Sequence, residues 1–189
     1  KRPPRLSACR QFIREQKARE RDCLMSTDGI LCLTGQLRRI LERWNLGVRL
    51  GQLPSGVDFG EEPLASPAGP PIDILYIGQL YPWKGVDNLI QAMQHLSGRR
   101  LTIVGGNRDK DLRRVADLAR GFGIEDRVEL VGHVSHARVC DYIRRALVCV
   151  VPLPRRGFRE SRFFTSPMKL FEFAAQGRAI VATDLPSLR

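Results

Sequence analysis

The sequence has no long hydrophobic run. None of its apolar stretches approaches the about 20 residues that a helix needs to cross a bilayer. The first residues, Lys1–Arg21, are too polar to contain the apolar segment of a secretory signal. The cysteine usage, described next, fits a reducing compartment, and we therefore expect a cytoplasmic protein. Because the chain starts without methionine and stops just after a strand-like segment, we also expect a piece of a longer protein.

The cysteines follow no pattern that is typical of a metal site or a disulfide framework. The five cysteines are an odd number, are widely spaced and include no Cys-x-x-Cys pair. This argues against a zinc site or a disulfide framework and fits a reducing compartment. Cys32 and Cys149 lie inside apolar strand patterns, which predicts that they are small core residues. The sequence also lacks Gly-x-Gly-x-x-Gly and Walker motifs, so it indicates neither a dinucleotide nor a P-loop.

Basic residues, by contrast, are abundant. The 31 lysines and arginines outnumber 20 acidic residues and give a formal net charge of +11. An anionic partner is therefore worth considering: nucleic acid, acidic lipid headgroups or a phosphorylated substrate. The basic residues are spread along the whole chain, and a solvated arginine-rich surface is the simpler interpretation. We do not expect nucleic acid, and we keep peripheral contact with an anionic membrane surface as an alternative.

Short apolar runs alternate with amphipathic stretches. The runs predict strands at Ile30–Leu33, Ile72–Ile77, Leu101–Val104, Val128–Val131, Leu147–Val151 and Ala179–Ala182. The amphipathic stretches predict helices at Leu6–Arg21, Gln36–Trp44, Val86–Leu96, Asp109–Arg120 and Ala137–Ala146. Several runs are continuously apolar, as in a parallel sheet covered on both faces. The fold class that follows is α/β with a doubly wound parallel sheet.

A proline-rich stretch divides the chain. Four prolines between Gly60 and Pro71 prevent regular structure. We expect residues 53–71 to be an interdomain linker and residues 72–189 to be one α/β domain, cut short at its C-terminus. Residues 1–52 offer one predicted strand and two helices, too little for a domain, and are expected to be the closing piece of a preceding α/β domain.

Two loops after predicted strands carry candidate binding residues. In Tyr76–Gly85 a strand ends, Gly78 allows a tight turn and Lys84 stands at the start of the next helix. Ligands of open α/β sheets bind at the carboxyl ends of strands, and a lysine beside a helix N-terminus suits phosphate. A solvated loop lysine is the simpler alternative. In the second loop His133 could be an acid or base, although a lone loop histidine is more often structural, and Ser135 fits a helix N-cap.

The run Thr165–Gly177 predicts an apolar helix that contains a cation and a carboxylate. Ser166 and Pro167 fit the N-cap and first helical position, and Gly177 fits the left-handed residue after the last turn. Lys169 and Glu172 are three residues apart and share a face. We expect this N-terminus to point into the same crevice as Lys84. There a cation can meet phosphate, and a carboxylate can accept hydrogen bonds from sugar hydroxyls.

Taken in order, these stretches resemble one family, the retaining GT-B glycosyltransferases called glycosyl transferases group 1. The matching pieces are Pro54-Ser-Gly-Val-Asp58, Gly78-Gln-Leu with Lys84-Gly85, Leu101-Thr-Ile-Val-Gly105, Val128-Glu-Leu-Val-Gly132, Val150-Val-Pro152, Ser166-Pro-Met-Lys-Leu-Phe-Glu172 and Ile180-Val-Ala-Thr183. The resemblance covers nearly all of residues 52–189 and rests on order and spacing. Residues 1–52 look like the end of the family's acceptor-side domain.

The resemblance implies a Rossmann-like domain that binds a nucleotide-sugar donor, with neither cofactor nor metal. Lys84 matches the lysine that neutralises the donor diphosphate, and Glu172 matches the second glutamate of the family's Glu-x7-Glu motif, which holds the ribose hydroxyls. The loop and helix start at Ser166 to Lys169 match the backbone that cradles the diphosphate and the donor sugar. Residues Gly132 to Val134 match the turn that lies against the nucleobase. The implied donor contacts are Gly78, Lys84, His133, Val134, Ser166, Met168, Lys169 and Glu172.

The sequence departs from the family pattern at two positions. The first glutamate of the motif would fall at Phe164, and Gln79 stands where the family often has an arginine. A subgroup with Ser-Pro-Leu-Lys before the last glutamate also lacks the first one, and this sequence looks like that subgroup. Arginines of the loop before the helix, namely Arg155, Arg156, Arg159 and Arg162, are candidates to replace the lost positive charge. No catalytic residue can be carried over, because the family's acceptor side is absent.

The resemblance implies transfer of a sugar, with retention of configuration, from a nucleotide-sugar to a polysaccharide or glycolipid acceptor. This stretch of chain by itself is expected to bind donor weakly and to turn over nothing. The alternatives are a non-catalytic interaction domain with a decayed site, a nucleic-acid or membrane-surface binder, and a nucleotide-sugar epimerase of the same fold. The sequence does not reveal the base, the sugar, the acceptor or the oligomeric state.

Overall fold

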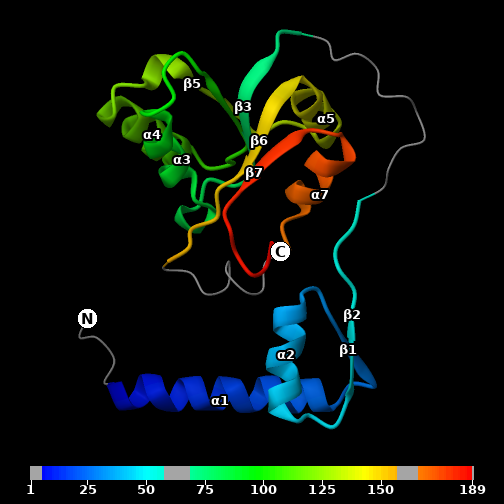
Figure 1. Ribbon diagram of the computed structural model, residues 1–189. Coiled ribbons are helices and arrows are strands. Elements are labelled where there is room, and N and C mark those ends of the chain that lie inside the picture. The colour runs from blue at the N-terminus through cyan, green and yellow to red at the C-terminus, as the bar shows by residue number, and fades with distance from the viewer. Residues whose placement is uncertain (1–5, 58–68, 157–165, 189) are drawn as a thin grey trace. The chain divides into compact units, whose positions relative to one another are not determined.

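The computed structural model describes residues 6–57, 69–156 and 166–188. The chain divides into two compact units, Lys1–Pro54 and Ser55–Arg189. Figure 1 shows the helices and strands of both units. Each unit is described by itself.

The first unit is a small α/β piece with four elements: α1 Leu6–Met25, β1 Gly29–Cys32, α2 Gly35–Trp44 and β2 Arg49–Gln52. The prediction of one strand was wrong, since Arg49–Gln52 pairs in parallel with β1. This strand is short and lacks an apolar run, so its sequence gives little signal. Thr34 caps α2 by accepting a hydrogen bond from the backbone N–H of Leu37 at 3.1 Å. Cys32, predicted to be a core residue, is fully buried.

The second unit is built on a five-stranded parallel sheet of order β5-β4-β3-β6-β7. Its elements are β3 Ile72–Ile77, the 3-10 turn η1 Pro82–Lys84, α3 Val86–Met93, β4 Leu101–Val104, α4 Asp109–Gly121, the 3-10 turn η2 Glu125–Arg127, β5 Val128–Gly132, α5 His136–Arg145, β6 Ala146–Val151, α7 Met168–Ala175 and β7 Ala179–Ala182. The predicted α/β class with a parallel sheet is therefore confirmed.

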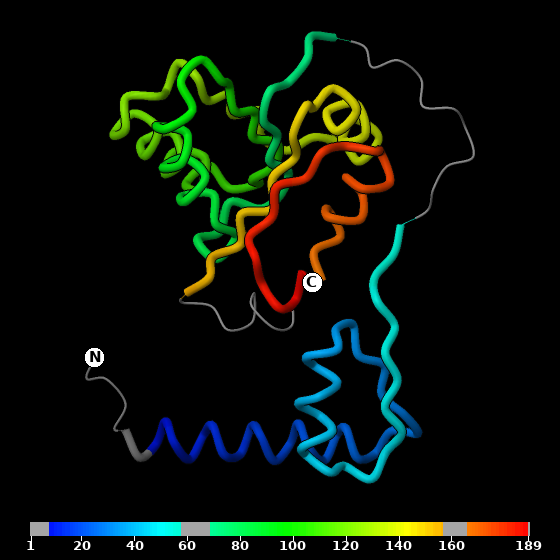
Figure 2. The backbone as a smooth tube through the Cα atoms, viewed as in Figure 1, coloured from blue at the N-terminus to red at the C-terminus, as the bar shows by residue number. Residues whose placement is uncertain are grey.

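The sheet is doubly wound. From β3 the chain runs outward to β4 and β5 and then returns to place β6 on the other side of β3, a path that can be followed in Figure 2. Helices α3 and α4 pack on one face of the sheet, and α5 and α7 pack on the other (Figure 1). The order of connections reverses between β3 and β6, and such switch points are where open α/β sheets bind ligands at their carboxyl ends.

Apolar side chains fill a core on each face. The α3 stripe predicted from spacing is buried, with Val86, Ile90 and Met93 fully inaccessible. Leu96, predicted to extend this stripe, is 41% exposed because the helix ends at Met93. On the other face Phe173 of α7 is fully buried against a cluster that includes Cys149. Burial raises the pKa of the Cys149 thiol to about 12, so this residue is an inert core side chain.

In the described residues no helix is both long and apolar enough to cross a membrane.

Candidate functional site

The carboxyl ends of β3 and β6 meet at the switch point through very close backbone packing. Gly85, the N-cap of α3, has φ +78°, and a Cβ at this position would overlap the carbonyl oxygen of Pro152, directly after β6. A Cβ at Gly105, after β4, would likewise overlap the carbonyl oxygen of Gly78, after β3. Glycine at these positions allows the strand ends to approach one another. The turn that carries Lys84 is thereby fixed at the end of β6.

Lys84 is the last residue of the η1 turn and lies next to the amino end of α3. Its backbone N–H donates to the carbonyl oxygen of Tyr81 at 2.8 Å. The side chain is partly exposed. Within the part of the chain that the structure describes, no hydrogen bond or ion pair occupies its ammonium group. A cation here, beside the positive end of the α3 dipole, is suited to bind an anionic ligand.

Helix α7 begins one residue later than predicted. Pro167 is the N-cap, with extended backbone at φ −74° and ψ 111°, and Met168 is the first helical residue. The prediction that Ser166 is the N-cap and Pro167 the first helical residue was therefore wrong. Among the described residues no side chain caps this N-terminus. The other end is as predicted, since Gly177 has φ +63° directly after the helix.

Lys169 and Glu172 form an ion pair on α7. Lys169 Nζ donates to Glu172 Oε2 at 2.5 Å, and the two side chains are 29% and 18% exposed. In exposure, this ion pair is intermediate between a solvent-exposed salt bridge and a fully buried one. The carboxylate of the predicted ribose site is thus bound by a lysine of the same helix.

Glu172 also lines a pocket between α5 and α7. Met168 contributes to the same pocket from the first turn of α7, and His136, Cys140 and Gln176 contribute as well. Sequence reasoning missed these last three residues. A signal was present, because His136 and Cys140 are four residues apart and face one way on a helix.

The two remaining predicted contacts follow β5. His133 is exposed, while Val134 is partly buried and packs against the core that lies beneath α5 and α7. The carbonyl oxygen of Gly132 accepts a hydrogen bond from Gly105 N at 2.7 Å, which joins the ends of β5 and β4.

The structure distributes the predicted contacts over the β3–α3 connection, the β5–α5 connection and the first half of α7 with the residue before it. Gly78 and Lys84 belong to the β3–α3 connection, and Met168 and Glu172 share the pocket between α5 and α7. Lys84 does not line that pocket.

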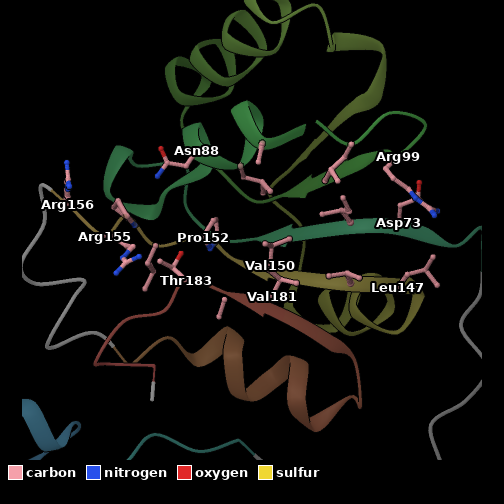
Figure 3. A pocket seen from close by; sticks show the side chains of 18 residues that line it. Asp73, Asn88, Arg99, Leu147, Val150, Pro152, Arg155, Arg156, Val181 and Thr183 are labelled. Carbon is pink, nitrogen blue, oxygen red and sulfur yellow. The ribbon is translucent and has the colours of Figure 1, made fainter. Parts of the chain in front are cut away.

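A larger cavity of about 1070 Å³ lies on the opposite face, between α3 and the exposed side of β6 and β7 (Figure 3). Its walls are mostly apolar, with Leu147, Val150 and Val181 along the strands. Arg155 and Arg156, proposed substitutes for lost positive charge, lie at one end of this cavity, away from the pocket that contains Glu172.

Several sequence features bear on metals and on the departures from the family pattern. The sequence contains one Asp-x-Asp, Asp109-Lys-Asp111, but the buried Asp111 accepts a hydrogen bond from Arg108 at 2.6 Å. The described residues contain no cluster of three or more His, Cys, Asp or Glu side chains that could hold a metal ion.

At Gln79, the side-chain Oε1 is buried without a hydrogen-bond partner among the described residues. Phe164, Arg159 and Arg162 lie outside the described residues.

Comparison with known proteins identifies relatives of this fold. The chain is 34% identical over 159 residues to a D-inositol 3-phosphate glycosyltransferase of Xylanimonas cellulosilytica, a match that covers 75% of this chain and 36% of that protein. It is 28% identical over 166 residues to a glycogen synthase of Mycobacterium tuberculosis, covering 84% of this chain and 38% of that protein. The chain therefore spans less than half the length of these curated relatives.

A solved structure agrees with these matches. The sucrose-phosphate synthase of Thermosynechococcus elongatus superimposes with a TM-score of 0.73 at 27% identity, covering 90% of this chain and 44% of that one. The GT-B-like architecture of such neighbours matches the doubly wound sheet described above. Residues 71–189 match the family described as glycosyl transferases group 1. This match covers more than half of the chain, which therefore belongs to the glycosyl transferases group 1 family.

Proposed function

We propose that the protein containing this chain transfers a sugar from a nucleotide-sugar donor to a polysaccharide or glycolipid acceptor, with retention of configuration. The observation that carries the proposal is that Glu172 and Met168 line one pocket between α5 and α7, while Lys84 lies in the connection after β3, beside the amino end of α3. Membership in the family supports it, as do the glycosyl transfer and glycogen synthesis named for the two relatives.

In this proposal the second unit holds the donor. Glu172 accepts hydrogen bonds from the ribose hydroxyls, so its carboxylate must exchange Lys169 for the ligand. Met168 and Ser166 line the approach to the sugar, Gly78 gives the loop its turn, and the base rests against His133 and Val134. Lys169, once released, can bind phosphate.

The chemical step gives the leaving diphosphate additional negative charge as the glycosidic bond breaks. Lys84 and the backbone N–H groups in the first turn of α7 are the groups that would stabilise this charge. A fixed donor aimed at developing charge typically contributes about 3 kcal/mol to the transition state. The acceptor is bound elsewhere in the longer protein, which is why the chain by itself is proposed to bind donor without turnover.

The test is isothermal titration of the 189-residue chain with UDP- and GDP-sugars. Because each variant removes a charge-assisted contact, Lys84→Ala and Glu172→Ala should each weaken binding about tenfold or more. Lys110→Ala is the matched control, since it removes an exposed lysine of α4 and should bind like the wild type. Equal affinity of both site variants and the wild type would refute the site.

A non-catalytic relative is the second candidate. It is favoured by Gln79, which replaces a cation, and by the ion pair that already occupies Glu172. Donor hydrolysis or transfer by the longer protein would exclude this candidate. For the location we propose the cytoplasm, with the surplus of basic residues available for peripheral contact with anionic lipid.

A further inference from the structure

The loop that precedes Lys84 is held by a side chain from another helix. Arg114 of α4 donates from Nη2 to the carbonyl oxygen of Leu80 at 2.6 Å, and from Nη1 to Asp87 Oδ1. Leu80 lies in the loop before Lys84, and Asp87 lies in the first turn of α3 after it. One guanidinium therefore bridges the two segments that flank Lys84.

Two neighbouring contacts fix the same loop. The buried Tyr76 hydroxyl donates to the carbonyl oxygen of Gln79 at 2.7 Å, and the Arg108 guanidinium lies 4.5 Å from the centre of the Tyr81 ring. Three successive loop residues, 79 to 81, are thus each bound by a side chain from β3, from α4 or from the residue before α4. These contacts restrain the loop on both its backbone and its side-chain surface.

The bridge that Arg114 makes between Leu80 and Asp87 is expected to add little to the free energy of unfolding. The Arg114 and Asp87 side chains are 31% and 44% exposed, and ion pairs of such exposure contribute little to folding. Arg114 Nη2 binds a backbone group, the carbonyl oxygen of Leu80, whose side chain is fully buried. The backbone before Lys84 therefore cannot move without breaking a charge-assisted hydrogen bond.

We propose that Arg114 is a positioning residue for Lys84: it holds the β3–α3 loop in the conformation in which the lysine ammonium meets a diphosphate. This inference rests on the proposed function, because it assigns Lys84 to the donor phosphates. A loop ordered before binding costs no ordering entropy when the ligand arrives. Arg114 itself touches no phosphate in this scheme and acts through Lys84.

The experiment compares Arg114→Met with Arg113→Met, its exposed neighbour on α4. Isothermal titration is done with UDP and with GDP, each against its monophosphate. Arg114→Met should weaken binding of the diphosphate about three- to tenfold, the cost of ordering one or two loop groups. It should leave monophosphate binding unchanged, and Arg113→Met should change neither.

A double-mutant cycle separates positioning from general destabilisation. In a Lys84→Ala background, Arg114→Met should have no further effect on diphosphate affinity, because the group that it positions is gone. Amide hydrogen exchange should rise at residues 79–85 in Arg114→Met and stay unchanged in the distant strand β7. Arg114→Lys, which can bond only one partner well, should recover part of the affinity and serves if Arg114→Met does not fold.

The outcomes distinguish the two hypotheses. If Lys84→Ala weakens diphosphate binding and Arg114→Met does not, the positioning role is wrong and the donor site stands. Additive effects of the two substitutions overturn the inference in the same way. If neither diphosphate binds the wild type, or if Lys84→Ala has no effect, the proposed site fails and the inference fails with it.

Discussion

The two parts of the proposed donor site are built in different ways. The β3–α3 loop is fixed before any ligand arrives: Tyr76 and Arg114 bind its carbonyl groups, and Gly85 packs on the backbone after β6. The first turn of α7 is open by comparison. No side chain in the described ranges caps it, and the carboxylate of Glu172 is held by a lysine of its own helix.

This difference suits the two roles that we propose: Lys84 is held in position for a phosphate, whereas Glu172 exchanges its counter-ion for a ligand. A lysine meant to neutralise a diphosphate gains most when its backbone is already placed, since electrostatic stabilisation depends on preorganised charge. A carboxylate meant to bind hydroxyls can instead carry a temporary counter-ion. The ion pair with Lys169 gives the partly buried Glu172 a partner, which avoids a costly unpaired charge, and under the proposed function the ligand would take its place.

The largest effect that we expect comes from the fixed part, in Gly85→Ala. A Cβ would overlap the Pro152 carbonyl oxygen and would also be strained at φ +78°, so the free energy of unfolding should fall by about 3 kcal/mol or more. Denaturant unfolding followed by circular dichroism measures this change.

Gly98→Ala is the matched control for Gly85→Ala. Gly98 has φ +73°, but nothing lies within 4 Å of a Cβ built there. This variant should lose only the cost of a left-handed alanine, about 1 kcal/mol. Equal losses in the two variants would mean that the approach of Gly85 to β6 has no energetic weight.

An intermediate effect is expected for Tyr76→Phe. The carbonyl of Gln79 loses its donor, which should cost about 1 kcal/mol of stability at neutral pH. Burial raises the pKa of Tyr76 above its ordinary value, so the folded state keeps this phenol neutral while the unfolded chain ionises. The hydroxyl's contribution is therefore complete below about pH 10 and is lost as the pH rises further.

The measurement for Tyr76→Phe is denaturant unfolding of both proteins at about pH 8 and about pH 10.5. The difference between wild type and variant should shrink at the higher pH. A difference that stays constant or grows would show that the hydroxyl does not hold the loop as a buried neutral donor.

The smallest effect is expected in the open part, for Lys169→Met. Removing one partner of this pair should cost about 0.5 kcal/mol of stability. Arg120→Met is the control, because the Arg120–Asp117 pair has the same spacing but is 66% and 69% exposed and should be silent. If Lys169→Met is equally silent in thermal unfolding, the pair on α7 is merely a surface bridge.

Much of the fold could be predicted from local patterns. The apolar stripe of α3 and the left-handed Gly177 came directly from spacing and from glycine chemistry. The start of α7 could not be predicted in this way. Pro167 is compatible with a first helical position, but its ψ of 111° is extended in the folded chain. Strand β2 was missed because its sequence, Arg49–Gln52, has no apolar run.

The site could be predicted only in part. Lys84 and Glu172 were found from their places after strands and from the family resemblance. Arg114 could not be found, because nothing in the local sequence of α4 says that its guanidinium reaches back to Leu80. The pocket between α5 and α7 could not be predicted either, because α5 precedes β6 in the sequence and α7 follows it.

By itself, the sequence determined the order of strands and helices, the faces that they bury and the positions where the chain turns. These are set by side-chain periodicity and by glycine and proline, which act over a few residues. The tertiary structure decided which strand ends meet. Strands β3 and β6 become neighbours only after the chain has run out to β5 and back, and this return brings Gly85 against Pro152.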